Sequence, residues 1–297
     1  MTDPTTGAAA LEILSPGIQT LIQDLGRPGL AAVGVGRSGA ADRGSFRRGA
    51  ALVGNPDAAA ALEVLLGGLQ VRVHGAVTLA VTGADLAVAV NGDPVRGKGS
   101  AADIVFSVDD GSVVTLGNAR RGLRGYLSVA GGIDVPPVLG SRSTDTLADL
   151  GPARPQRGDL LPVGIAAPRR DSPAAATVLP DGELLLRVIR GPRDDWFADP
   201  ELLVRTAWAV SPRSDRIGVR VTGGDLRRSA GRGELPSEGM VHGCLQVPPN
   251  GEPVLLMPDH PVTGGYPVIG VVIDADLDLI AQARPGQSVR FRWAESG

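Results

Sequence analysis

The sequence is poor in several residue types that carry recognisable chemistry. Among its 297 residues Cys244 is the only cysteine, so no internal disulfide forms and a cysteine-rich zinc site is excluded. Aromatic residues make up 3% of the chain, so its cores must be built from Ala, Val, Leu and Ile. Lys98 is the single lysine among 29 basic residues, which we interpret as codon bias in a GC-rich genome.

Targeting and membrane signals are also missing. The first ten residues lack the basic region and apolar core of a signal peptide, and no run of about 18 apolar residues occurs. The net charge of -3 gives no electrostatic footprint for nucleic acid, and three scattered histidines are weak support for a metal site. We therefore expect a soluble, cytoplasmic protein that binds neither membranes nor nucleic acid and holds no metal on its own.

What the chain has in abundance is turn residues between short apolar runs. Its 42 Gly and 24 Pro follow no collagen period, and 43% of residues are hydrophobic. Residues 69–74 alternate, with Val71 and Val73 on one face and polar residues on the other. This pattern predicts a mainly β protein, of barrel or sandwich type, with a few short helices. Strands are expected near residues 11–14, 18–22, 69–74, 77–81, 86–90, 104–108, 113–116, 126–130, 184–189, 254–257, 270–273 and 288–293, whereas 58–66 fits a strand or a helix.

Composition also suggests how the chain divides. Residues 1–10 are expected to be a disordered lead-in, and 165–182 are rich in Ala and Pro without periodicity, which is typical of a linker. The prediction is thus a first domain over 11–164 and a second over 183–297. Within the first, Asp42 has the character of a helix N-cap, because its carboxylate can accept the free N–H groups of a helix that runs to Val53.

The richest stretch for function is residues 243–268. Val254 to Met257 is predicted to be a buried strand, with Asp259 and His260 where it ends. Gln246 lies earlier in the stretch, and Thr263-Gly264-Gly265-Tyr266 follows, placing two residues without side chains beside a hydroxyl and a phenol. Paired glycines allow backbone N–H groups to approach an anion closely, which favours a binding loop. An ordinary β-turn that carries polar side chains is the alternative interpretation.

Two loops in the first half carry paired charges or hydroxyls. Asp24 and Arg27 stand three apart in a glycine-rich turn, which fits either a local ion pair or the edge of a pocket. Arg142, Ser143 and Thr144 join a fixed positive charge to hydroxyl donors, a combination suited to a carboxylate or phosphate. A turn with incidental hydroxyls fits equally well, and the spacing of a phosphate-binding P-loop is absent.

A third charged segment is residues 211–221. If it is extended, Arg216 and Arg220 share one face and can line a cleft, whereas Asp215 lies on the other. An exposed charged strand is the competing interpretation.

Taken together, the segments resemble a known family. QDLGRPG, SGAAD, LVGN, TGAD, YLSVAGGID, GSRST, SDRIGVR, LQVPPNGEPVLLMPD and TGGYPV occur in order over about residues 11–292. They resemble the family of 5-oxoprolinase C subunits, also called allophanate hydrolase subunit 2 or biotin-dependent carboxyltransferase, and part of the carboxyltransferase domain of urea carboxylase. The resemblance implies two cyclophilin-like β-barrel domains.

The resemblance also implies an activity. With subunits A and B, the family opens 5-oxo-L-proline to L-glutamate at the expense of ATP, with Mg²⁺ and nucleotide possible at the partner interface, and this chain is inactive alone. The expected catalytic residues are Arg216, Arg220 and Asp259. The expected substrate-binding residues are Asp24, Arg27, Arg142, Ser143, Thr144, Gln246, Thr263 and Tyr266. The alternatives are a carboxyltransferase module of a biotin-dependent urea carboxylase, although no biotinyl-lysine motif surrounds Lys98, and a non-enzymatic antagonist of a sporulation-kinase inhibitor.

Overall fold

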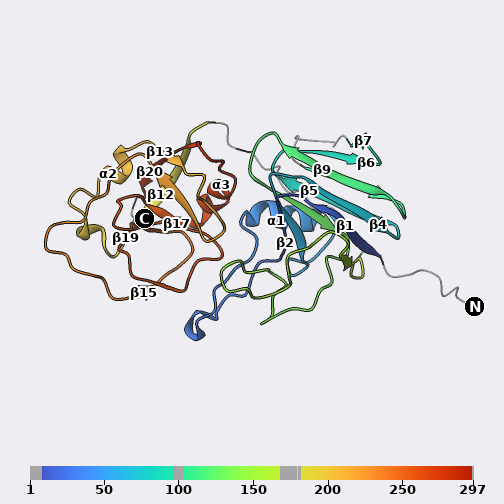
Figure 1. Ribbon diagram of the computed structural model, residues 1–297, viewed down its shortest axis with the longest axis horizontal. Helices are drawn as coiled ribbons and strands as arrows, with labels where there is room; N and C mark the ends of the chain where they lie inside the picture. Colours follow the sequence, from blue (N-terminus) through green and yellow to red (C-terminus); the bar gives the residue numbers. More distant parts are fainter. Residues whose placement is uncertain (1–8, 96–102, 168–178, 180–181, 296–297) are drawn as a thin grey trace, which may run out of the picture. The chain divides into compact units, whose positions relative to one another are not determined.

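A computed structural model describes residues 9–95, 103–167, 179 and 182–295, and its chain divides into two compact units (Figure 1). The first comprises Met1–Arg27, Asp42–Thr144 and Leu150–Leu179, and the second Pro28–Ala41, Asp145–Asp149 and Pro180–Gly297. Two short segments of the first half thus belong to the second unit, which a single boundary in the sequence does not anticipate. Most of the predicted lead-in and linker, and Lys98, lie outside the described residues.

The first unit contains two antiparallel sheets, drawn from blue to green in Figure 1. One has the order β11 (Leu160–Pro162), β1 (Ala10–Pro16), β4 (Leu69–His74), β9 (Val113–Ala119), β6 (Leu86–Val90) and β7 (Asp93–Pro94). The other has the order β2 (Gln19–Gln23), β3 (Ala61–Leu65), β10 (Arg124–Val129), β5 (Val77–Gly83) and β8 (Ile104–Val108). Alternate residues of both sheets, such as Val71 and Leu62, form one apolar core.

The helix α1 (Arg43–Leu52) contacts β5 and β10 of the five-stranded sheet. Asp42 caps it as predicted, because its carboxylate accepts from the backbone N of Ser45 at 2.9 Å. Residues 58–66 resolve to the strand β3, since the alternation of Leu62 and Val64 toward the core outweighs the helical propensity of the segment.

The second unit is built on a closed barrel of seven strands, drawn from yellow to red in Figure 1. Its order is β12 (Leu184–Arg190), β19 (Val268–Val272), β16 (Cys244–Gln246), β17 (Val254–Leu256), β14 (Gly218–Thr222), β13 (Trp208–Val210) and β20 (Ser288–Trp293). The β12–β20 pair is parallel, and the remaining pairs are antiparallel. Phe197 and Trp208 are buried in its core, and Trp196 is partly buried against it.

Short elements complete the second unit. A two-stranded sheet pairs β15 (Glu238–Gly239) with β18 (Thr263–Gly264). The helices are α2 (Leu202–Arg205) and α3 (Leu277–Ala281), with single 3-10 turns η1 (Ala31–Val33), η2 (Asp194–Trp196) and η3 (Asp274–Asp276). The predicted fold class, mainly β with a few short helices, is confirmed. The sequence left open whether the strands form a barrel or a sandwich. In the structure, the first unit has two sheets and the second has a closed barrel.

Candidate functional site

Arg216 and Asp259 form a buried charge pair in the second unit. Their side chains are 2% and 0% exposed. Arg216 donates from Nε to Oδ2 and from Nη2 to Oδ1 of Asp259, both at 2.9 Å, which is the bidentate geometry of guanidinium on carboxylate. Nη2 also donates to the carbonyl of Gly39 at 2.6 Å. Two of the predicted catalytic residues therefore meet, within a buried network.

The backbone brings this pair together. β14 and β17 pair with Gly218 opposite Leu256, and the ladder continues past the strand ends. There the N–H of Asp259 donates to the carbonyl of Arg216 at 3.0 Å. This backbone hydrogen bond places the two residues side by side, close enough for two parallel side-chain hydrogen bonds.

Two further side chains complete the coordination of the Asp259 carboxylate. Ser38 Oγ donates to Oδ1 at 2.8 Å, and Thr146 donates to Oδ2 from its Oγ1 at 2.6 Å and its N–H at 3.0 Å. Ser38 and Thr146 belong to the two segments, 28–41 and 145–149, that the second unit takes from the first half of the chain. Asp259 thus holds both segments on the barrel, so its role is to position other parts of the second unit.

Electrostatics favour the charged form of Asp259. Burial opposes ionisation, but the adjacent Arg216 guanidinium and the hydrogen bonds from Arg216 and Thr146 prevail and hold the pKa of this carboxyl below its ordinary value. Asp259 is therefore an anion at neutral pH and not a proton donor.

The loop that follows Asp259 leads into the two-stranded β15–β18 sheet. This sheet and its flanking turns, residues 238–242 and 260–266, are called the outer layer below. Met240 N donates to the carbonyl of Val262 at 2.9 Å, so the ladder continues one step beyond β15 and β18. Just beyond, the imidazoles of His242 and His260 stack with centroids 6.4 Å apart and an interplanar angle of 20°. His260 is 6% exposed, and its Nδ1 lies 2.8 Å from the carbonyl of Pro261. Burial lowers the pKa of His260, which favours the neutral ring.

The predicted substrate-binding residues of the second unit lie on this layer. Thr263 and Tyr266 are exposed, and Gln246 is buried beneath them with Nε2 3.4 Å from the carbonyl of Tyr266. A Cβ at Gly264 would lie 2.3 Å from Gln246 Nε2, whereas one at Gly265 would meet only ordinary contact. The absence of a Cβ at Gly264 therefore lets the Gln246 amide come up against the β18 backbone, and a larger residue would displace the end of that side chain.

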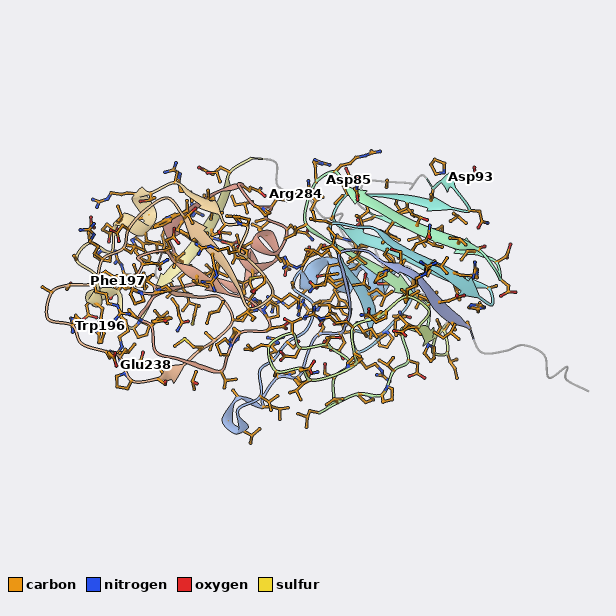
Figure 2. All side chains as sticks on the ribbon, viewed as in Figure 1. Asp85, Asp93, Trp196, Phe197, Glu238 and Arg284 are labelled. Atoms are coloured by element: carbon orange, nitrogen blue, oxygen red, sulfur yellow. The ribbon has the colours of Figure 1, made fainter. Side chains whose placement is uncertain are left out.

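At the edge of the same layer, Glu238 of β15 forms an ion pair with Arg193. Arg193 also lies over the ring of Trp196, 5.9 Å from its centroid. Figure 2 shows Glu238 and Trp196 on the same part of the second unit. Glu238 is consequently engaged by a neighbour and anchors the sheet.

The expectation that Arg216 and Arg220 share one face is wrong. Asp215 Oδ1 accepts from the N–H groups of Ile217 and Gly218 at 2.8 and 3.0 Å, which makes a turn before β14. Arg216 belongs to that turn and is buried, whereas Arg220 lies within β14 and is exposed. The period-2 rule fails here because the segment becomes extended only at Gly218.

In the first unit, a second polar cluster surrounds Asp24. Its Oδ1 accepts from Ser141 Oγ and Ser143 Oγ at 2.6 Å each and from Gly26 N at 2.7 Å, and Oδ2 accepts from Arg142 N at 2.6 Å. The Asp24 N–H donates back to Ser143 Oγ at 2.9 Å. Asp24 is 5% exposed, so the predicted local pair with Arg27 is replaced by a carboxylate that organises the 141–143 loop.

The remaining predicted residues of the first unit support the same loop. Arg27 is 2% exposed, donates from Nη2 to the Ser143 carbonyl, and leaves its Nη1 buried without a hydrogen-bond partner. Thr144 Oγ1 donates to the carbonyl of Pro152 at 2.9 Å. Arg142 is turned toward Asp134 at 3.2 Å and the Val135 carbonyl at 2.7 Å, with its side chain 29% exposed. Arg142 is thus the member of this group whose charge reaches solvent.

Sequence reasoning missed a third buried cluster, on the α1 side of the five-stranded sheet. Tyr126 of β10 lies between Glu63 of β3 and Thr82 of β5 in register. Its hydroxyl donates to Glu63 Oε2 at 2.7 Å and accepts from Asp42 N at 2.8 Å. Burial first, and then the charges of Glu63 and Asp42, raise the pKa of Tyr126 well above its ordinary value. The sequence did contain one sign of this cluster, because Glu63 is a charged residue within the otherwise apolar run at 61–65.

Within the described residues, no three His, Cys, Asp or Glu side chains gather as metal ligands would. Over the same residues, no helix has the length and apolar character needed to cross a bilayer.

The chain belongs to the carboxyltransferase domain family (subdomain A and B), whose model matches residues 33–293, so the family resemblance is confirmed. It is 38% identical over 290 residues to the 5-oxoprolinase C subunit of Escherichia coli strain K12, covering 95% of this chain and 90% of that protein. Urea amidolyase of Lachancea kluyveri is 33% identical over 310 residues, covering 95% of this chain and 17% of that protein. The crystal structure of Kluyveromyces lactis urea amidolyase superimposes with a TM-score of 0.89 at 29% identity, covering 97% of this chain and 19% of that one.

Proposed function

We propose that this chain is the C subunit of an ATP-dependent 5-oxoprolinase, which opens 5-oxo-L-proline to L-glutamate together with two further subunits. The observation that carries the proposal is the 38% identity to the E. coli protein of that name, which extends over nearly the whole of both sequences. The urea amidolyase relatives are less identical and match over a small share of their length.

The proposed reaction requires groups that bind its substrate, and exposed side chains of the second unit can supply some of them. The substrate is a small ring with one carboxylate and one lactam amide, so it needs a cation for the carboxylate and donors for the amide oxygen. Thr263 and Tyr266 offer exposed hydroxyls beside β18, and Arg220 offers an exposed guanidinium. We assign substrate contact to these side chains.

The buried residues receive a different role. Arg216 and Asp259 are bonded to each other and to the segments carrying Ser38 and Thr146, so they do not reach a bound substrate directly. We propose that they position the loop at 260–266, because Asp259 is the last fixed point before that loop begins. A positioning role predicts that their loss changes stability as well as rate.

Nucleotide binding belongs to the assembled complex in this proposal. The sequence lacks a phosphate-binding glycine loop with its lysine, and the described residues hold no acidic group of three for Mg²⁺. We therefore assign no step through ATP to the side chains of this chain.

A carboxyltransferase module of a urea carboxylase is the second candidate. The similarity to urea amidolyases, at 33% and 32% identity over 95% of this chain, favours it. Its substrate would be a urea-like acceptor, with biotin delivered on another polypeptide.

Reconstitution separates the two candidates. The chain is co-expressed with candidate subunits A and B, and release of glutamate and ADP from 5-oxoproline is measured. Activity that requires all three chains is the expected result, with no activity from this chain alone. Absence of glutamate release from an assembled complex, together with carboxylation of urea by carboxybiotin, would replace the first candidate with the second.

A further inference from the structure

A pocket of about 420 Å³ opens on the second unit away from the residues discussed above. It lies between residues 225–228, which follow β14, and the turn at Pro248–Asn250, which joins β16 to β17. None of the predicted site residues lines it. The proline-rich turn is a prominent feature of the sequence to which the proposed function gives no role.

Arg228 is the notable side chain of this pocket. It is half-buried, and its Nε is enclosed without a hydrogen-bond partner. Among the described residues, no carboxylate or carbonyl bonds to the Arg228 guanidinium. No acceptor of the described chain satisfies the Arg228 Nε–H, and its guanidinium belongs to a residue that lines the pocket, so its permanent charge is left for an acceptor that enters the pocket.

The neighbouring acids do not satisfy Arg228 because each is bound elsewhere. Asp225 accepts from Arg227 Nε at 2.6 Å. Glu252 accepts from Asn250 Nδ2 at 3.0 Å and pairs with Arg213 at 3.2 Å. The lining residues Asp225, Arg227 and Arg228 sum to one positive charge, and that excess is located on Arg228.

The frame of the pocket is fixed by backbone hydrogen bonds. Leu226 N donates to the carbonyl of Gly251, and Gly251 N to the carbonyl of Pro248, both at 3.0 Å. Gly251 has φ 75°, and a Cβ there would lie 2.3 Å from Asp225 Oδ1, so the turn approaches Asp225 as only glycine allows. A ligand would therefore meet a preformed pocket with an apolar wall at Pro248.

We propose that this pocket binds a small oxyanion, a carboxylate or a phosphate, through the guanidinium of Arg228. The planar guanidinium offers parallel N–H donors that match either oxyanion, and Pro248 and Pro249 supply contact for a short apolar body. The proposal does not depend on the reaction of the complex, because it rests on residues outside the loop at 260–266.

The test is an NMR titration of the full chain with a ¹⁵N label, following the Nε–H signals of arginine. The signal of Arg228 is assigned from its loss in Arg228→Met and Arg228→Lys. Sodium phosphate and sodium acetate are added in separate titrations at constant ionic strength, with sodium chloride as the reference. We expect a saturable shift of this signal with at least one oxyanion, and the responding probe distinguishes phosphate from carboxylate.

The variants decide whether Arg228 is responsible. In the Arg228 variants, and for comparison in the parent, the affinity is read from the Nε–H signal of Arg227, which also lines the pocket. Arg228→Met should weaken the oxyanion affinity at least tenfold and Arg228→Lys several-fold, whereas substitution of Arg292, an exposed residue on β20, in Arg292→Met should leave it unchanged. Thermal unfolding is used to check that each variant folds. If Arg228→Met does not fold, the comparison rests on Arg228→Lys. Absence of a saturable shift with either oxyanion, or equal affinity in the folded Arg228 variants and the parent, overturns the proposal.

Discussion

Removing the Asp259 carboxylate should destabilise the second unit more than any surface change. Asp259→Ala deletes the acceptor of five hydrogen bonds, two of them from Arg216, and leaves that arginine without its counterion. Breaking a buried ion pair by removing one partner costs about 3–5 kcal/mol. With a urea dependence of about 2 kcal/mol per M, the midpoint of unfolding should fall by roughly 2 M.

Tryptophan fluorescence gives a selective assay of this effect. All 3 tryptophans, Trp196, Trp208 and Trp293, belong to the second unit, so urea unfolding followed at this signal reports that unit. Arg220→Ala is the matched control, because its exposed side chain should change stability by less than about 0.5 kcal/mol.

A double variant isolates the charge. Arg216→Met with Asp259→Leu removes both partners, and it should recover at least about 1 kcal/mol relative to Asp259→Ala, because no unpaired charge remains buried. A loss below about 1 kcal/mol in Asp259→Ala would refute the view that this network holds segments 28–41 and 145–149 on the barrel. Failure of the double variant to recover stability would show that hydrogen bonds to Ser38 and Thr146, and not the charge pair, carry the effect.

Two further predictions concern buried groups. Tyr126→Phe removes the hydroxyl that bridges Glu63 and the Asp42 N–H, so it should lower the free energy of unfolding by about 1–3 kcal/mol, and an unchanged thermal midpoint would contradict the bridging role. Because burial lowers the pKa of His260, the unfolded chain takes up a proton at higher pH than the folded chain, and stability should decrease as the pH falls below about 6.5. Urea midpoints at pH 7.5 and 5.5 should therefore differ less in His260→Gln than in the parent, with His74→Gln, in the first unit, as the control.

Much of the secondary structure follows from local pattern. Val71 and Val73 alternate with polar neighbours because β4 has one face on the core, and Asp42 begins α1 because a carboxylate at that position satisfies a free N–H. The segment at 58–66 was ambiguous because its composition suits both states. Only the sheet that receives it, between β2 and β10, decides for a strand.

The candidate site was less accessible to sequence reasoning. Arg216 and Asp259 were both named as candidate catalytic residues, but neither their pairing nor their burial was predicted, because a charged side chain is buried only when partners surround it. Those partners are Ser38, which is 221 residues away from Asp259, and Thr146, which is 113 away. No periodicity relates positions so distant, and a hydroxyl in a loop has no local feature that marks it as a ligand of a buried carboxylate.

The sequence by itself determined the class of fold, the approximate positions of many of the strands, and the family to which the chain belongs, because these depend on local alternation, turn chemistry and collinear motifs. The tertiary structure decided which polar residues are buried and which reach solvent. It sorted Arg216 from Arg220, four residues apart, into an enclosed ion pair and an exposed side chain. The physical reason is that burial and pairing are properties of the barrel as a whole, set by strand register and by segments that arrive from far along the chain.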